Sequence, residues 1–124
     1  MTIDVQTFVS DILGALRGAL SEGWSKISAF AEKQAKMLAQ QGALIAQSRL
    51  AGTLSEDDDL FDFFVQQLKD LTTNFARSVA TMTLLTIEQA WNALVGVVWG
   101  TVNKALSAGR LAGLPLPTLT LGAG

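Results

Sequence analysis

The sequence predicts an all-α fold, in which two long helices form an antiparallel hairpin that is oligomeric and carries an extended C-terminal arm. Apolar residues recur at steps of three and four through both halves of the chain, which is the spacing of one helical face. One break, rich in glycine and acidic residues, divides the halves at residues 51–59. We therefore expect a hairpin over 1–109, with helices over about 4–50 and 55–107, and an arm over 110–124.

The composition favours an oligomer over a free monomer. Apolar residues make up 49% of the 124-residue chain and charged residues only 16%, against roughly 25% charged residues in ordinary soluble domains. A chain of this length forms one domain, and two helices bury only one seam between them. We therefore expect further copies of the chain to cover the remaining apolar surface.

The first helix is predicted to be amphipathic. Its polar side carries two acid–base pairs four residues apart, Glu22–Lys26 and Glu32–Lys36, which indicate a solvated face and not a binding site. Its apolar side is formed by Val5, Phe8, Val9, Ile12, Leu16, Leu20, Trp24, Ile27, Ala31, Leu38 and Ile45.

Glycines at steps of four occur in both helices. Gly14 and Gly18 form a GxxxG motif in the first helix, and Gly96 and Gly100 repeat the spacing in the second. A glycine inside a helix costs about 1 kcal/mol relative to alanine, so we expect these positions to permit close approach of another helix. The two motifs either face each other within the hairpin or face neighbouring copies, and the sequence leaves both arrangements open.

The segment between the helices contains signals for ending one helix and starting the next. Gly52 can adopt the left-handed conformation that ends a helix. Thr53 with Glu56, or Ser55 with Asp58, has the spacing of a capping box, and the run of four acids suits the positive end of a helix dipole. Because a calcium loop alternates its ligands and includes a turn glycine, we favour capping over a metal site.

The second helix is almost free of charge in its C-terminal half. Between residues 79 and 102 apolar side chains point in nearly every direction around the helix axis, which is typical of a buried helix. We expect neighbouring copies to bury it, with Arg77 and Glu88, eleven residues apart on one face, paired between copies. The predicted oligomer interface comprises Gly14, Gly18, Arg77, Glu88, Trp91, Asn92, Gly96, Trp99 and Gly100.

A membrane-spanning role is the main alternative for this segment. Residues 79–100 are numerous enough to cross roughly 30 Å of hydrocarbon. However, Glu88, Gln89 and Asn92 lie in the middle, and an ionisable group there is costly unless protein surrounds it. The sequence therefore disfavours a single lipid-facing span, but it leaves open a bundle of several copies with Glu88 and Asn92 in a polar interior.

The C-terminal arm cannot be helical through Pro115 and Pro117. Its leucines argue against free solvation, so we expect the arm to dock on a partner as an extended edge strand and not to remain a free tail. The predicted docking residues are Leu114, Pro115, Leu116, Pro117, Leu119 and Leu121.

The residue types present argue against most catalytic and ligand-binding chemistry. The chain contains no histidine, cysteine or tyrosine, which removes the common bases, nucleophiles and zinc ligands. No glycine-rich loop lies between a strand and a helix, and the nine basic residues are scattered. We therefore expect no enzyme activity, cofactor, metal ion or small-molecule substrate, and no sequence-specific contact with nucleic acid.

Three classes of function are compatible with these patterns. We rank first a non-enzymatic structural subunit that assembles with itself, and with other proteins of the same assembly, into a ring, tube or shell, as in a virus or phage particle (a tail, internal or ejection protein). The second is a membrane-active, pore-forming or holin-like protein. The third is an amphipathic coat on an apolar particle, because residues 31–47 are similar in composition to the granule-binding phasins. The N-terminus lacks the pattern of a secretory signal, which favours a virion or the cytoplasm.

Overall fold

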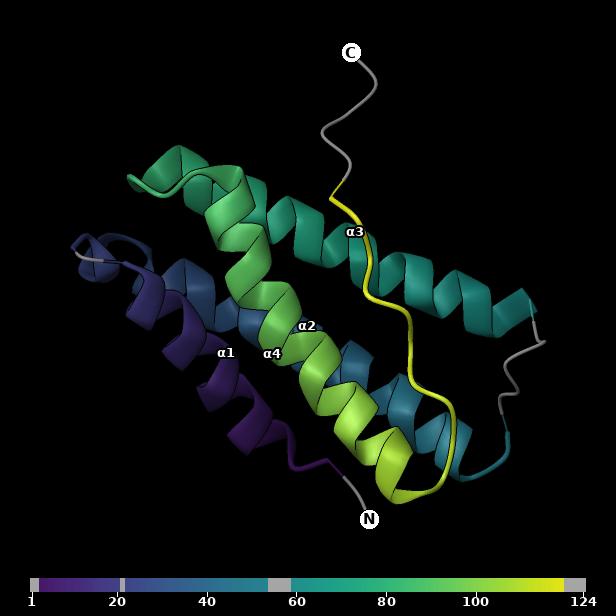
Figure 1. The fold of residues 1–124 in the computed structure, drawn as a ribbon. Coiled ribbons are helices and arrows are strands. Elements are labelled where there is room, and N and C mark those ends of the chain that lie inside the picture. The colour runs from purple at the N-terminus through teal and green to yellow at the C-terminus, as the bar shows by residue number, and fades with distance from the viewer. Residues whose placement is uncertain (1–2, 21, 54–58, 120–124) are drawn as a thin grey trace.

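The computed structural model describes residues 3–20, 22–53 and 59–119, and these residues form four α-helices. The helices are α1 (Val5–Ala19), α2 (Trp24–Leu50), α3 (Asp59–Met82) and α4 (Ile87–Ala108). They pack as a four-helix bundle in which consecutive helices run antiparallel (Figure 1). The prediction of an all-α fold is confirmed, and the described part of the chain contains no strand.

Each of the two expected long helices is interrupted once, which corrects the prediction of a simple hairpin. The first, expected over 4–50, ends at Ala19 and resumes at Trp24. Gly23 precedes α2 with a left-handed backbone (φ 89°), a conformation that an uninterrupted right-handed helix does not contain. Gly14, Gly18 and Gly23 also lower the helix propensity of this stretch, so the chain turns here at little cost.

The second expected helix is interrupted between α3 and α4. The Thr86 hydroxyl accepts a hydrogen bond from the Gln89 backbone N–H (3.1 Å), and the Gln89 side-chain oxygen accepts one from the Thr86 N–H (2.9 Å). This reciprocal pair is a capping box that starts α4. At the end of α3, the Thr83 hydroxyl donates to the Val79 carbonyl (2.7 Å) and accepts from the Leu85 N–H (3.2 Å).

The end of α2 follows the prediction. Gly52, two residues beyond the last helical residue, has a left-handed backbone (φ 77°). The backbone N–H and the hydroxyl of Thr53 both donate to the Ser48 carbonyl, at 3.0 and 3.2 Å. These bonds satisfy a helix-end carbonyl that would otherwise need water. The predicted capping boxes lie outside the described residues, because they involve 54–58.

Helix α4 packs against all three other helices. Helix α2 does so too, whereas α1 and α3 do not contact each other. Because the two interruptions create four shorter helices, α1, α2 and α3 surround the apolar faces of α4 within one chain. The need for neighbouring copies to bury this segment, inferred from the sequence, therefore does not arise. The buried residues of α4 are Ala90, Trp91, Leu94, Val95, Val98, Trp99, Val102, Ala105 and Leu106.

A close approach between helices occurs at Gly42 of α2. A Cβ atom built on Gly42 would lie 3.0 Å from a ring carbon of Phe8 in α1 and 3.2 Å from a methyl carbon of Val102 in α4. Both neighbours are buried. The absence of a side chain at this position therefore lets three helices meet. By contrast, a Cβ atom at any glycine of the two GxxxG motifs would meet no atom within 4 Å.

We predict that Gly42→Ala destabilises the fold, whereas Gly14→Ala and Gly96→Ala stabilise it. The extra methyl group at position 42 forces buried side chains to move, at a cost of about 1–3 kcal/mol that outweighs the gain in helix propensity. Alanine at an open helical position lowers the folding free energy by about 0.5–1 kcal/mol. Urea unfolding of the monomer, followed by circular dichroism, measures these changes. A loss of stability in both open-position variants would contradict the exposed placement of their glycines.

Candidate interaction surfaces

The four glycines of the GxxxG motifs are exposed. Gly14 and Gly18 lie on α1, and Gly96 and Gly100 lie on α4. The two helices contact each other (Figure 1), yet no atom lies close to any of these glycines. Within the chain the motifs therefore do not pack against each other. Their contact with a neighbouring copy stays a prediction.

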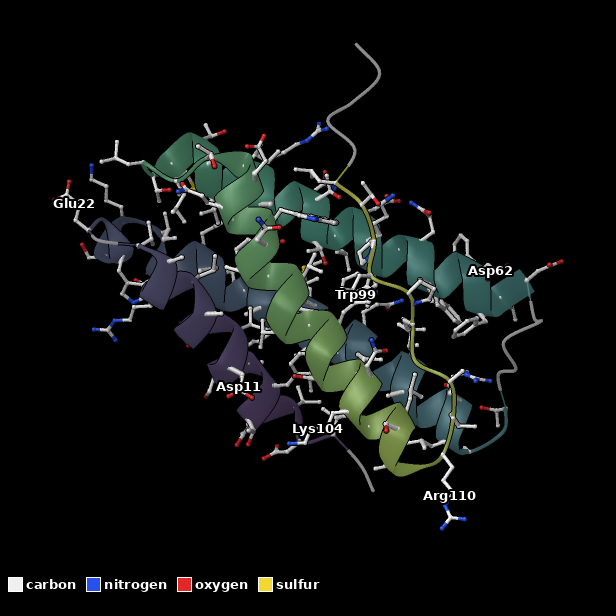
Figure 2. The ribbon with its side chains drawn as sticks, in the orientation of Figure 1. Asp11, Glu22, Asp62, Trp99, Lys104 and Arg110 are labelled. Carbon is white, nitrogen blue, oxygen red and sulfur yellow. The ribbon has the colours of Figure 1, made fainter. Side chains whose placement is uncertain are left out.

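The two tryptophans of the predicted interface lie in the chain's own core. Trp91 is 4% exposed and Trp99 is fully buried, and Figure 2 shows Trp99 between α3 and α4. Neither side chain is therefore presented to a partner as a surface anchor.

The polar residues of the predicted interface, Arg77, Glu88 and Asn92, are exposed. Arg77 belongs to α3 and Glu88 to α4. The expectation that these two side chains share one face of one helix is therefore wrong, because the chain turns between them. The proposed pairing of Arg77 and Glu88 between copies stays untested.

An exposed apolar surface that the sequence analysis did not single out crosses α2 and α3. Its four large side chains are each about half exposed, and we call them the α2/α3 patch. They are Met37 (47% exposed) and Leu44 (46%) on α2, and Leu60 (56%) and Phe63 (55%) on α3.

Hydrogen bonds between α2 and α3 bring these side chains to one face. Gln41 lies one helical turn from both patch residues of α2. Its amide donates to the Phe64 carbonyl (3.3 Å) and to the Gln67 side-chain oxygen (3.4 Å) on α3. Phe64 in turn packs against Phe63, with ring centroids 5.9 Å apart. The apolar side chains of the two helices thus flank one polar contact.

The α2 side of the α2/α3 patch is uncharged. Residues 37–48 of α2 contain no acidic or basic side chain, and neither do residues 63–67 of α3. Asp59 and Asp62 of α3, however, flank Leu60. Glutamine supplies the polar atoms at the contact between the two helices. The charged side chains beside the patch on α3 are therefore at its Leu60 end.

The C-terminal arm docks on its own chain. The Asn103 amide of α4 donates to the Leu114 carbonyl (3.0 Å), and the Asn103 side-chain oxygen accepts from the Leu114 N–H (2.6 Å). Leu114 is 6% exposed, and the half-buried Leu119 packs against the core. The arm follows the space between α4 and α3 (Figure 1). It makes these contacts without forming a strand in its described residues, 110–119.

The other predicted docking residues of the arm differ in exposure. Leu116 is 70% exposed, Pro115 is exposed and Pro117 is half-buried. Leu121 lies outside the described residues. Docking within the chain therefore depends mainly on Leu114, whose backbone and side chain are both engaged.

A second exposed apolar position lies at the α3–α4 turn. Leu84 is 84% exposed and Met82 is 40% exposed. Both line a hollow of about 490 Å³ that also includes Glu22 and Gly23 of the α1–α2 turn. The two turns thus meet at one end of the bundle, where Figure 2 labels Glu22.

The acidic side chains of the described residues form no metal site, and one of them has a shifted pKa. No group of three or more acidic side chains among them is arranged to hold a metal ion. A hydrogen bond from the Thr7 hydroxyl (2.7 Å) lowers the pKa of Asp4, but this carboxylate also accepts from the Gln6 N–H as the N-cap of α1. The lowered pKa of Asp4 therefore results from its role in capping α1.

Because comparison with known proteins finds no match, the exposed surfaces are the basis for proposing a function. No protein family model matches the chain, and neither a curated protein nor a solved structure matches it. None of the described helices combines the length and apolar character that crossing a membrane requires.

We predict that Asn103→Ala weakens docking of the arm. Loss of both side-chain hydrogen bonds to Leu114 costs about 1–3 kcal/mol of stability and accelerates hydrogen exchange at the Leu114 amide. Leu116→Ala serves as the control, because the exposed side chain at 116 contributes less than about 0.5 kcal/mol. Urea unfolding and amide exchange by NMR measure the two effects. Unchanged exchange at Leu114 in the Asn103 variant would contradict the docked geometry.

Proposed function

We propose that this chain is a non-enzymatic structural subunit that associates with further copies of itself through the α2/α3 patch. The observation that carries the proposal is the cluster of four large apolar side chains, each 46–56% exposed, on adjacent helices. Large apolar side chains gathered on one exposed face are typical of interaction surfaces. The uncharged α2 side of the patch favours a second copy over a strongly charged partner.

The size of the patch indicates a weak contact. Full burial of one large apolar side chain contributes about 1.5–3 kcal/mol, and these side chains are already about half buried. Eight such side chains from two copies therefore contribute on the order of 6–12 kcal/mol. Association itself costs roughly 4–15 kcal/mol. The patch alone thus supports a reversible dimer, and a stable assembly needs a further contact.

The expectation of a ring, tube or shell remains part of this proposal. A two-fold contact through one patch closes a dimer, whereas an extended assembly needs a second, different contact. The exposed glycine motifs of α1 and α4 offer a smooth surface away from the α2/α3 patch. Virus and phage particles are the class of many-copy assembly that we propose for such a subunit.

We predict that the chain associates reversibly in plain buffer and that the double variant Leu44→Gln/Phe63→Gln does not. Glutamine keeps helix propensity but removes half-exposed apolar surface, so circular dichroism should stay unchanged. Light scattering over a concentration series measures the mass, which should rise above 13.2 kDa for the parent only. Leu84→Gln, at the other exposed position, is the matched control and should associate like the parent.

Two results would overturn this proposal. One is a parent chain that keeps the mass of a monomer at every concentration. The other is a double variant that associates as strongly as the parent, because association would then use another surface.

Contact with a membrane surface is a second candidate function. Leu84, at the tip of the α3–α4 turn, is 84% exposed, and Met82, two residues earlier, is also exposed. An apolar turn at the end of a bundle can insert into the interface of a bilayer without any helix crossing it.

We predict for this second candidate that the chain sediments with zwitterionic liposomes. Leu84→Gln should reduce binding by about tenfold or more, since burial of this leucine contributes about 1.5–3 kcal/mol. The Leu44→Gln/Phe63→Gln variant is the control and should bind liposomes like the parent. Absence of sedimentation, or equal binding by Leu84→Gln, would eliminate this candidate.

A further inference from the structure

We propose that the C-terminal arm is exchanged between copies, so that the arm of one chain occupies the α3/α4 groove of another. By the arm we mean its described residues, 110–119, and by the α3/α4 groove the surface around Asn103 of α4 to which Leu114 is hydrogen-bonded, along the side of α4 that faces α3 (Figure 1). This inference rests on the proposed function, because the exchange needs copies that are already held close together.

The groove recognises the arm mainly through its backbone. Asn103 donates to the Leu114 carbonyl and accepts from the Leu114 N–H, which are the two bonds that a neighbouring strand would make with an extended peptide. The Leu114 side chain fills the core beside them. All of these contacts join the arm to α4 and the bundle, so they are equally available to an arm that arrives from another chain.

The turn that leads into the arm is strained. Arg110 has a left-handed backbone (φ 62°), which a residue with a side chain rarely adopts. The Arg110 N–H donates to the Ser107 carbonyl (2.9 Å) and the Leu111 N–H donates to the Leu106 carbonyl (2.8 Å), which closes the turn. Figure 2 shows the Arg110 side chain pointing away from the bundle. Opening the turn relieves the strained backbone without removing a side-chain contact of Arg110, and short strained turns favour exchange.

Connectivity decides which arm fills the groove. Only residues 109–113 join the end of α4 to Leu114, and so short a connection gives the chain's own arm an effective concentration on the order of millimolar. In dilute solution the arm therefore stays on its own chain. Two copies held at the α2/α3 patch raise the local concentration of the foreign arm, and exchange between these two copies then adds a second contact to the dimer.

Engineered cysteines can report which arm occupies the groove. A Cβ atom built on Gly113 would lie 3.5 Å from the Asn103 Cβ atom, and disulfides join Cβ atoms about 3.5–4.5 Å apart. The chain has no cysteine of its own. Cysteine at position 103 removes both hydrogen bonds to Leu114, so the double variant Asn103→Cys/Gly113→Cys reports an arm held by the buried Leu114 side chain. In this variant the disulfide forms within one chain when the arm is docked there, and between chains when arms are exchanged.

The experiment oxidises the double variant over a concentration series and separates the products on a non-reducing gel. We expect cross-linked monomers in dilute solution, and covalent dimers at concentrations where light scattering shows association. Adding Leu44→Gln/Phe63→Gln should return the product to cross-linked monomers. A mixture of the two single-cysteine variants, Asn103→Cys and Gly113→Cys, provides an independent check, because a 103–113 disulfide between them forms only by exchange.

The outcomes separate this inference from the proposed function. Association by light scattering with disulfides only within chains, and no 103–113 disulfide in the mixture, overturns arm exchange and leaves self-association through the patch intact. Disulfides only within chains, together with a monomeric mass at every concentration, overturn both.

Discussion

Burial of α4 is the constraint on which the rest of the structure depends. Apolar side chains surround most of its axis, and residues such as Leu94, Val98 and Trp99 are fully buried. One neighbouring helix covers one side only, so the chain must bring three helices around α4. The two turns, before Trp24 and before Ile87, make this possible by dividing two long apolar segments into four. The fold therefore buries within one chain the apolar surface that, from the composition alone, several chains were expected to cover.

The sequence predicts the helical class because both halves of the chain carry helical periodicity, and it predicts the end of α2 because Gly52 has a local signal. It does not reveal the α3–α4 turn by periodicity, because the apolar run continues through Leu84, which is 84% exposed. The hydrophobicity of a residue does not show whether the backbone continues as a helix or turns at that position. The capping pair Thr86 and Gln89 is the local signal that marks this turn.

Surfaces are harder to predict than elements, because they depend on pairing between distant segments. The GxxxG spacing indicates close helix contact at Gly14 and Gly96, whereas the structure has it at Gly42, where α1 and α4 meet α2. The α2/α3 patch depends on the packing of α3 against α2, a contact to which Gln41 adds a hydrogen bond. The arm illustrates the same limit. Its prolines and leucines predict an extended docking segment, but the position of Asn103 decides where it docks.

The bundle buries α4 within one chain, and we propose that copies of it associate weakly through the α2/α3 patch. Hydrogen–deuterium exchange of the parent chain, measured over a concentration series, tests most directly whether one chain buries α4 by itself. The account predicts that amides of α4 between Leu94 and Val102 exchange among the slowest in the chain and that their rates do not change with dilution. Loss of this protection in the dilute monomer would contradict the account, because neighbouring copies would then be what buries α4.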